Sequence, residues 1–479
     1  MEKKRKKKPS ANREFAVVTY LFLGIFLAMM AYLIYFQVVK SEDFINSPYN
    51  KRQDSFATRI VRGEIRSADD KVLAQTQVDE AGNETRVYPY GSLYAHVVGF
   101  ATNGKSGLES TMNFNLLRSH DFVLERIVNE LKGEKSMGDT VVTTLDSRLQ
   151  EAAYNTLGSY KGAVMVMEPS TGKILAMVSK PDFDPNTIAQ NWDALISEDA
   201  GESVLLNRAT QGMYPPGSTF KILTTLEYIR ENPNYNEFTY HCNGGETYGE
   251  TTIHCYGNQA HGDQDLKAAF ANSCNSAYAS IGLGLDKDKF AVLCNSLLFN
   301  QELPGTLGAK PSSFSLNAST SAALTMQTAI GQGETLVSPY HMLLIASAIA
   351  NDGVLMKPYL VDHTQNQNGV EVKKYEAVQY GEFMTGEEAA LLQEYMSAVV
   401  TNGTGAKLAG TSYHVAGKTG SAEFSSNKNE SHSWFVGYAG REEKPEVAIV
   451  VVGEGAGTGS AVAVPAARQI LDIYFSYAE

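Results

Sequence analysis

A serine and a lysine three positions apart are the first residues in the chain that could act together chemically. They are Ser218 and Lys221, and the Pro-Pro-Gly run just before them excludes a helix there. The apolar spacing of residues 219–229 predicts a helix that begins at this point, with both side chains on one face. A serine hydroxyl becomes a nucleophile when a neighbouring base takes its proton, and a neutral lysine can be that base. The free N–H groups at a helix start also favour a developing oxyanion.

The same pattern has a simpler explanation, because a serine at a helix start commonly serves as an N-cap. The pattern also recurs at residues 425–428, in a polar segment that no apolar helix follows, so nothing there would desolvate the lysine. Taken alone, Ser218 fits a nucleophile and a cap equally well.

A second candidate is Ser273-Cys274-Asn275, which lies between two apolar stretches with helical spacing. A hydroxyl and an amide two residues apart can point into the same site from a turn. An ordinary capping turn explains them too, and residues 315–317 repeat the pattern.

A third candidate is Lys418-Thr419-Gly420-Ser421, on a strand predicted for residues 415–421. The lysine and the two hydroxyls form a cationic, hydrogen-bonding row suited to a carboxylate, and the glycine lets a substrate approach the backbone. The alternative is an edge strand that a lysine protects from pairing.

The three patterns occur in this order in the penicillin-binding proteins and β-lactamases, and the chain resembles the class B, monofunctional penicillin-binding proteins. The resemblance extends along nearly the whole chain. It also includes the segments Arg62-Gly63-Glu64-Ile65, Gly107-Leu108-Glu109 and Gly331-Gln332-Gly333, together with Asp146.

The resemblance implies a peptidoglycan D,D-transpeptidase that forms an acyl-enzyme on Ser218 and is inhibited by β-lactams. Lys221 would be the general base, and Ser273 with Lys418 would pass a proton to the leaving amine. Asn275 would hold the substrate backbone, and the strand residues Thr419, Gly420 and Ser421 would bind the terminal carboxylate. Two other functions stay open: a non-catalytic wall-assembly scaffold of the same fold and, less favoured, a membrane-bound β-lactamase.

An N-terminal membrane anchor is predicted at residues 15–39, which contain no charged residue. As a helix this run spans about 37 Å, enough for the hydrocarbon core of a bilayer. It is too long for a cleaved signal peptide, and no small-x-small cleavage site follows it. Residues 1–14 hold seven Lys/Arg and two Asp/Glu, so the positive-inside rule predicts a cytoplasmic tail and an extracytoplasmic catalytic domain.

The whole chain has a net charge of −13, and because the tail carries +5, the remaining residues carry about −18. So acidic a surface argues against nucleic acid as a partner. The expected partners are peptidoglycan stem peptides, lipid-linked precursor strands, β-lactams, the membrane itself and, by resemblance, a membrane glycan polymerase.

Four cysteines are present, and no metal or other cofactor is expected. Cys242 and Cys255 share a polar, glycine-rich stretch and are the plausible disulfide pair. Histidines precede both, at 241 and 254, but a metal site of two His-Cys pairs is disfavoured because the tight C-x-x-C spacing is missing. Cys294 is expected to be a small core residue.

The overall expectation is an α+β chain with a small β-rich pedestal at residues 40–140 and a serine transpeptidase/β-lactamase-like domain at 141–479. Pedestal strands are predicted at 72–74, 86–88 and 96–100, a helix at 147–157, and a hairpin at 162–179. Strands at 413–415, 434–439 and 447–452 return after a helical middle at 218–400, and a helix closes the chain at 462–475. Strands at both ends around helices favour one antiparallel sheet carrying an all-helical subdomain.

Overall fold

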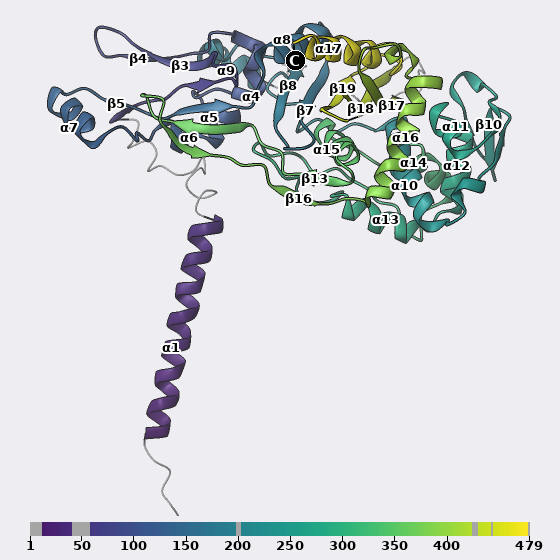
Figure 1. Ribbon diagram of the computed structural model, residues 1–479, viewed down its shortest axis with the longest axis horizontal. Coiled ribbons are helices and arrows are strands. Elements are labelled where there is room, and N and C mark those ends of the chain that lie inside the picture. The colour runs from purple at the N-terminus through teal and green to yellow at the C-terminus, as the bar shows by residue number, and fades with distance from the viewer. Residues whose placement is uncertain (1–11, 41–57, 198–202, 424–429, 442–443, 478–479) are drawn as a thin grey trace, which may run out of the picture.

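The computed structural model describes residues 12–40, 58–197, 203–423, 430–441 and 444–477. Within this part of the chain one helix is long and apolar enough to cross a membrane, over Arg13–Val38. It comprises α1 (Asn12–Tyr35) and a single π-helical turn, η1 (Phe36–Lys40). This helix stands apart from the folded body, as Figure 1 shows, and it confirms the predicted apolar helix. The basic tail lies mostly outside the described residues.

The pedestal is built on a six-stranded sheet in the order β15-β14-β6-β2-β3-β4. Two of these strands, β14 and β15, come from far along the chain, between helices of the catalytic half (Figure 1). The strands are β2 (Ile65–Arg66), β3 (Val72–Val78), β4 (Glu84–Val87), β6 (Thr140–Thr143), β14 (Val361–Gln365) and β15 (Glu371–Lys374).

Smaller elements complete this half of the molecule. They are β1 (Ile60–Val61), which pairs in parallel with β5 (Ser136–Met137), and the helices α4 (Ala95–Val98), α5 (Gly107–Thr111), α6 (Asn113–Leu116), α7 (Val123–Lys132) and α9 (Ile188–Ile196).

The prediction of a strand at residues 96–100 is wrong, because the chain forms the short helix α4 there. Two adjacent valines favour a strand by local propensity. In the structure Val97 and Val98 are both buried in the core, and the His96 ring contacts the Pro181 carbonyl at 3.2 Å. Burial against these distant segments overrides the local preference of the sequence.

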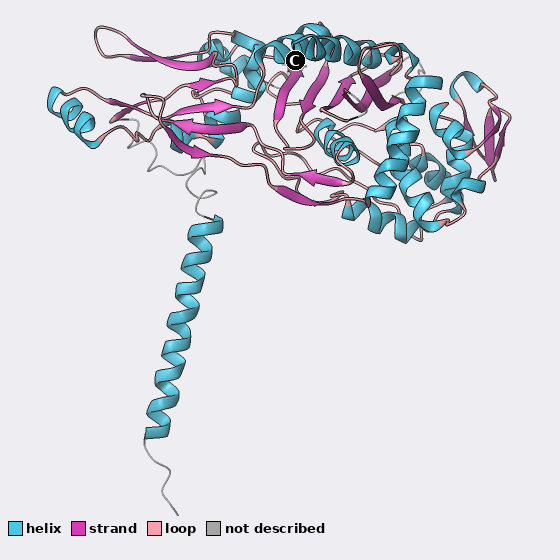
Figure 2. Ribbon diagram, in the orientation of Figure 1, coloured by secondary structure: helices cyan, strands magenta, loops and turns pink. Residues whose placement is uncertain are grey.

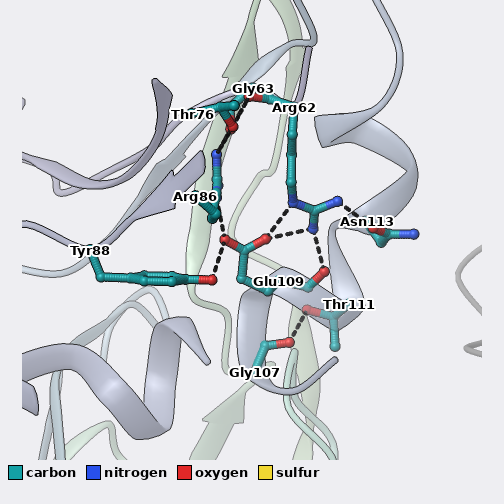
Figure 3. A network of polar contacts seen from close by, with 9 residues as sticks. All are labelled: Arg62, Gly63, Thr76, Arg86, Tyr88, Gly107, Glu109, Thr111 and Asn113. Atoms are coloured by element: carbon teal, nitrogen blue, oxygen red, sulfur yellow. Dashed lines mark hydrogen bonds and ion pairs between the residues drawn. The ribbon is translucent and has the colours of Figure 1, made fainter. Parts of the chain in front are cut away.

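A buried carboxylate joins the two pedestal segments that carried the family resemblance (Figure 3). Glu109 accepts hydrogen bonds from Arg62 Nε at 2.6 Å and from Arg86 Nε at 2.7 Å. Tyr88 donates to the same carboxylate at 3.2 Å, and Arg62 also bonds Asn113. Burial alone would raise the pKa of Glu109, but Arg62 and Arg86 outweigh it and hold that pKa below its usual value.

The catalytic half is organised around one antiparallel sheet in the order β17-β18-β19-β7-β8, which confirms the predicted sheet made from both ends of the domain. Helices α8 and α17 cover one face, and α15 packs on the other. All residues of β19 are buried, which explains its uninterrupted apolar sequence. The elements are β7 (Gly162–Met167), β8 (Ile174–Lys180), β17 (His414–Glu423), β18 (Ser431–Gly440), β19 (Val447–Gly453), α8 (Ser147–Leu157), α15 (Pro339–Ala350) and α17 (Ala463–Tyr477).

Most of the regular structure between the two parts of the sheet is helical, as predicted. The expectation of an all-helical subdomain is wrong, because this segment also contains short strand pairs that the sequence did not reveal (Figure 2). Each of these strands has three or four residues, too few for a readable alternation. The helices are α10 (Lys221–Glu231), α11 (Leu266–Ala271), α12 (Asn275–Gly284), α13 (Lys287–Ser296), α14 (Ala322–Ala329) and α16 (Gly386–Asn402). The strands are β9 (Tyr240–Cys242), β10 (Gly245–Tyr248), β11 (Thr251–His254), β12 (Gly262–Gln264), β13 (Val354–Met356) and β16 (Gln379–Glu382).

Candidate active site

Ser218 lies in a tight turn, η5 (Gly217–Phe220), that leads directly into helix α10. Gly217 has a φ of +53°, which a glycine adopts without strain, and its N–H donates to the Gly331 carbonyl at 2.9 Å. The Thr219 hydroxyl closes the turn by donating to the Pro216 carbonyl at 2.7 Å. Ser218 is half-buried between buried neighbours. The turn therefore presents this hydroxyl from a firmly held backbone.

Lys221 begins helix α10 and is completely buried. Its Nζ lies 2.7 Å from the Ser273 carbonyl, 3.2 Å from Ser273 Oγ and 2.7 Å from Asn275 Oδ1. The amine thus reaches both polar residues of the second sequence pattern. The Tyr278 ring lies on the same side, with its centre 5.3 Å from Nζ.

Lys418 approaches the same oxygen from strand β17 and is also completely buried. Its Nζ lies 2.9 Å from Ser273 Oγ and 3.2 Å from the Thr419 carbonyl. Residues from all three sequence patterns therefore meet around one hydroxyl.

Burial dominates the electrostatics of both lysines. Burial lowers the pKa of Lys221 to about 7. The Cys274 and Cys255 sulfurs raise that pKa, but their effect is smaller than that of burial. The pKa of Lys418 is lowered well below its usual value, first by burial and then by repulsion from Lys221. Repulsion between two cations is mutual, so it disfavours a second proton on this pair of lysines.

The turn that carries Ser273 is strained. Ser273 lies between α11 and α12 with a φ of +54°, a region that residues other than glycine seldom occupy. The next residue, Cys274, is the N-cap of α12, and its sulfur accepts from the Ala277 N–H. This backbone shape holds Ser273 Oγ between the two lysines, and strain of this kind is common at functional sites.

Strand β17 lies directly against the Ser218 turn. A Cβ added to Gly420 would come within 2.9 Å of Thr219 Cγ2 and 3.0 Å of the Pro216 carbonyl, so only glycine fits there. The Ser421 hydroxyl accepts from the Gly459 N–H at 3.1 Å, which leaves its own proton free to donate. The predicted carboxylate-binding row therefore runs beside the predicted nucleophile.

Two supporting residues were missed from the sequence. The Thr404 hydroxyl lies 2.6 Å from the Thr419 hydroxyl, and Gly459 donates to Ser421. Thr404 stands between two glycines, and a Cβ on the first of them, Gly403, would lie 2.2 Å from the Ala271 carbonyl. A glycine pair after a helix signals such a close approach, and this was the available clue. The repeated Ser-x-x-Lys pattern at residues 425–428 lies entirely outside the described residues.

The suggested Cys242–Cys255 disulfide is absent from the structure. All four cysteines are free and buried, and the two sulfurs lie 3.7 Å apart, well beyond a disulfide bond. Cys294 lies in the core, as expected.

Comparison with known proteins gives matches over most of the chain. Residues 162–472 match the family described as penicillin binding protein transpeptidase domain, and residues 62–141 match the penicillin binding protein A dimerisation domain. The chain is 30% identical to peptidoglycan D,D-transpeptidase PbpA of Mycolicibacterium smegmatis, over 95% of this chain and 98% of that protein.

Solved structures agree with these matches. The D,D-transpeptidase domain of a peptidoglycan glycosyltransferase from Eggerthella lenta is 30% identical, with a TM-score of 0.78 over 87% of this chain and 99% of that one. The imipenem acyl-enzyme complex of penicillin-binding protein A from Mycobacterium tuberculosis is 29% identical, with a TM-score of 0.79 over 88% of this chain and 100% of that one.

Proposed function

The chain belongs to the class B penicillin-binding proteins, and on that premise we propose that Ser218 is the nucleophile of its peptidoglycan D,D-transpeptidase reaction. The observation that carries the assignment is the meeting of Lys221 and Lys418 at Ser273 Oγ, next to the turn that holds Ser218. A buried pair of amines beside a serine hydroxyl provides a base at neutral pH.

In the first half of the reaction, Ser218 Oγ attacks the carbonyl between the two D-alanines of a stem peptide. Lys221 takes the hydroxyl proton, and an ester to Ser218 replaces the peptide bond. The departing D-alanine needs a proton on its amine, which Ser273 delivers and Lys418 replenishes. Backbone N–H groups of Ser218 and Ser421 stabilise the oxyanion, and one such donor typically contributes a factor of about 10²–10³ in rate.

In the second half, the amine of a neighbouring stem peptide attacks the ester. The amine loses its proton to the same relay, and the Ser218 oxygen regains a proton as it leaves. The products are the cross-linked peptide and free enzyme, so no redox step and no cofactor is needed.

Substrate orientation is assigned to the residues around this relay. Asn275 binds the backbone amide of the stem peptide, and the hydroxyls of Thr419 and Ser421 bind the terminal carboxylate, with Gly420 leaving room between them. A β-lactam has a similar carboxylate and a strained amide. It therefore acylates the same serine, and its opened ring stays attached.

We assign the apolar helix α1, the one candidate span among the residues that the structure describes, as a single-pass membrane anchor. We assign the basic N-terminal tail (1–14) to the cytoplasm, residues 15–39 to the membrane, 40–140 to the pedestal and 141–479 to an extracytoplasmic transpeptidase domain, which also contributes β14 and β15 to the pedestal sheet. This arrangement places Ser218 on the side of the membrane where peptidoglycan is assembled. The anchor also offers a helix that could pair with a membrane glycan polymerase.

Treatment of the full-length protein with penicillin, followed by proteolysis and mass spectrometry, tests the nucleophile directly. We expect the mass of the drug on the peptide that contains Ser218, and its loss in Ser218→Ala. The matched control is Ser425→Ala, which removes the serine of the second Ser-x-x-Lys pattern and should leave labelling unchanged. Folded protein that carries no label on Ser218 would overturn the proposal.

A further inference from the structure

Three cysteines and a histidine converge behind the Ser273 turn. The donor atoms of Cys242, Cys255, His261 and Cys274 all lie within 4.8 Å of one another, and the three cysteines are buried. They come from three places in the chain: Cys242 ends β9, Cys255 and His261 lie at the two ends of the loop between β11 and β12, and Cys274 is the N-cap of α12. None of them is needed for the acyl-transfer steps described above.

The spacing of these atoms is that of tetrahedral zinc ligands. Cys255 Sγ lies 3.7 Å from both Cys242 Sγ and Cys274 Sγ, and Cys242 Sγ lies 3.4 Å from His261 Nδ1. Zn–S bonds of about 2.3 Å and Zn–N bonds of about 2.0 Å place sulfurs about 3.8 Å apart and sulfur and nitrogen about 3.5 Å apart at tetrahedral angles. The protein therefore holds the donors at distances suited to a central ion.

The surroundings also suit sulfur in its thiolate form. The Gly244 N–H lies 3.4 Å from Cys242 Sγ, and the Ala277 N–H lies 3.5 Å from Cys274 Sγ. The Ser276 hydroxyl is 3.0 Å from Cys255 Sγ. Such contacts around the ligands orient them and stabilise their charge in metal sites.

A disulfide explains this cluster less well than a metal does. A bond between Cys242 and Cys255 would use two of the four donors and leave Cys274 and His261 without a role. The histidines that the sequence had suggested lie elsewhere: His241 is exposed and pairs with Asp263 at 2.6 Å, whereas His254 is not one of the four converging residues.

We propose that Cys242, Cys255, His261 and Cys274 bind one Zn²⁺ ion, and that this ion fixes the second active-site motif in place. Four protein ligands fill a tetrahedral shell, so the ion is structural and not a Lewis acid for the substrate. Its thiolate ligands exclude hard cations such as Mg²⁺ and favour zinc.

The link to the active site is Cys274, which stands between Ser273 and Asn275. Lys221 contacts both of those neighbours, and Lys418 contacts Ser273. A bond from Cys274 to zinc would tie the strained turn to β9 and to the β10–β11 hairpin. Any effect on acylation rests on the proposed transpeptidase function, whereas metal binding itself does not.

Metal analysis of the full-length protein, purified in detergent without chelator, is the direct test. We expect about one zinc per chain, and most of it should be lost in Cys242→Ser and in His261→Ala. Cys294→Ser removes a buried cysteine outside the cluster, and His241→Ala removes an exposed neighbour, so both controls should keep the metal. Cobalt(II) in place of zinc should give the intense absorption of a tetrahedral thiolate site in the parent protein and in both controls.

Two outcomes would overturn the site: folded parent protein without stoichiometric zinc that also takes up none when zinc is added, or a Cys242–Cys255 disulfide found by mass spectrometry. The proposed effect of the ion on the second active-site motif has a separate readout, which is the rate at which a fluorescent penicillin labels Ser218. We expect His261→Ala to slow labelling at least tenfold while the chain stays folded. Loss of zinc with an unchanged labelling rate would refute the effect of the ion on the active-site motif, and it would leave the assignment of Ser218 as the nucleophile intact.

Discussion

Lys221 and Lys418 share one hydrogen-bond partner, because their Nζ atoms lie 3.2 and 2.9 Å from the same Ser273 Oγ. Both amines are completely buried. A proton on one disfavours a proton on the other, and burial disfavours both. The pair therefore holds less than two positive charges near neutral pH, which provides a neutral amine as the base.

The acylation rate should rise with pH through about 7, since burial lowers the pKa of Lys221 to about 7 and the base must be neutral to accept the Ser218 proton. The measurement is the rate of labelling by a fluorescent penicillin as a function of pH. Lys221→Ala should lower the rate by a factor of about 10²–10⁴. Lys267→Ala removes a surface lysine paired with Glu394 and should change neither rate nor profile. A parent rate that is flat with pH would contradict this role for Lys221.

Removal of the Ser273 hydroxyl should separate chemistry from backbone strain. Ser273→Ala and Ser273→Gly both lose the shared oxygen and should be equally impaired in cross-linking. The glycine variant should be more stable than the alanine variant by about 1 kcal/mol, because the φ of +54° is unstrained only for glycine. Thermal or denaturant unfolding measures the difference.

The control is Ser315, the serine of the second Ser-x-Asn pattern, which is not among the positive-φ residues. There the alanine variant should be at least as stable as the glycine variant. If the glycine variant were more stable than the alanine variant at both positions, backbone strain at Ser273 would not be the cause of the difference there.

Loss of the buried carboxylate in the pedestal should destabilise the protein strongly. Glu109→Gln leaves Arg62 and Arg86 buried without a counter-charge, for which we expect a loss of about 3–5 kcal/mol in the free energy of unfolding. The pKa of Glu109 is lowered in the fold, so its contribution is present above the unfolded pKa and is lost as pH falls through the folded one. The gap between parent and variant should therefore shrink in acid.

Glu80→Gln is the matched control, since Glu80 is exposed in the same half of the chain. Its effect should stay within about 0.5 kcal/mol. Denaturant unfolding measures the free energy of unfolding of both variants. Equal losses of stability in the two would show that the network in Figure 3 contributes little to the stability of the fold.

Much of the catalytic half could be predicted because its signals are local. Helix α8 has an Asp146 N-cap and regular apolar spacing, and the β7–β8 hairpin has a clear turn. Strand β14 could not be placed from sequence, since its partner β6 is distant and nothing local specifies that pairing. His261 was missed for the same reason, because its cysteine neighbours are brought to it only by the fold.

The sequence motifs did not predict the geometry of the site either. The order of the three patterns predicted which residues would meet, but not that both lysines would contact one hydroxyl. It did not reveal the positive φ of Ser273 either, since nothing in the residue type favours that conformation.

The turn that holds Ser218 depends on Gly331, and a methyl group there should disable it. Gly331 has a φ of +79°, and an added Cβ would lie 1.9 Å from the Gly217 carbonyl. Gly331→Ala should therefore push the Ser218 turn away from strand β17 and lower the penicillin labelling rate by about 10²-fold, as displacements of about 1 Å can.

Gly369 gives a control with the same backbone and no clash: its φ is +76°, and nothing lies within 4 Å of an added Cβ. Gly369→Ala should lose about 1 kcal/mol of stability, as any residue other than glycine does in this conformation, and should keep the parent labelling rate. Both variants place an alanine at a similar positive φ and should lose similar stability for that reason. The difference between their labelling rates therefore measures the effect of the contact with Gly217. Equal labelling rates in the two variants would mean that the position of the Ser218 turn does not depend on this contact.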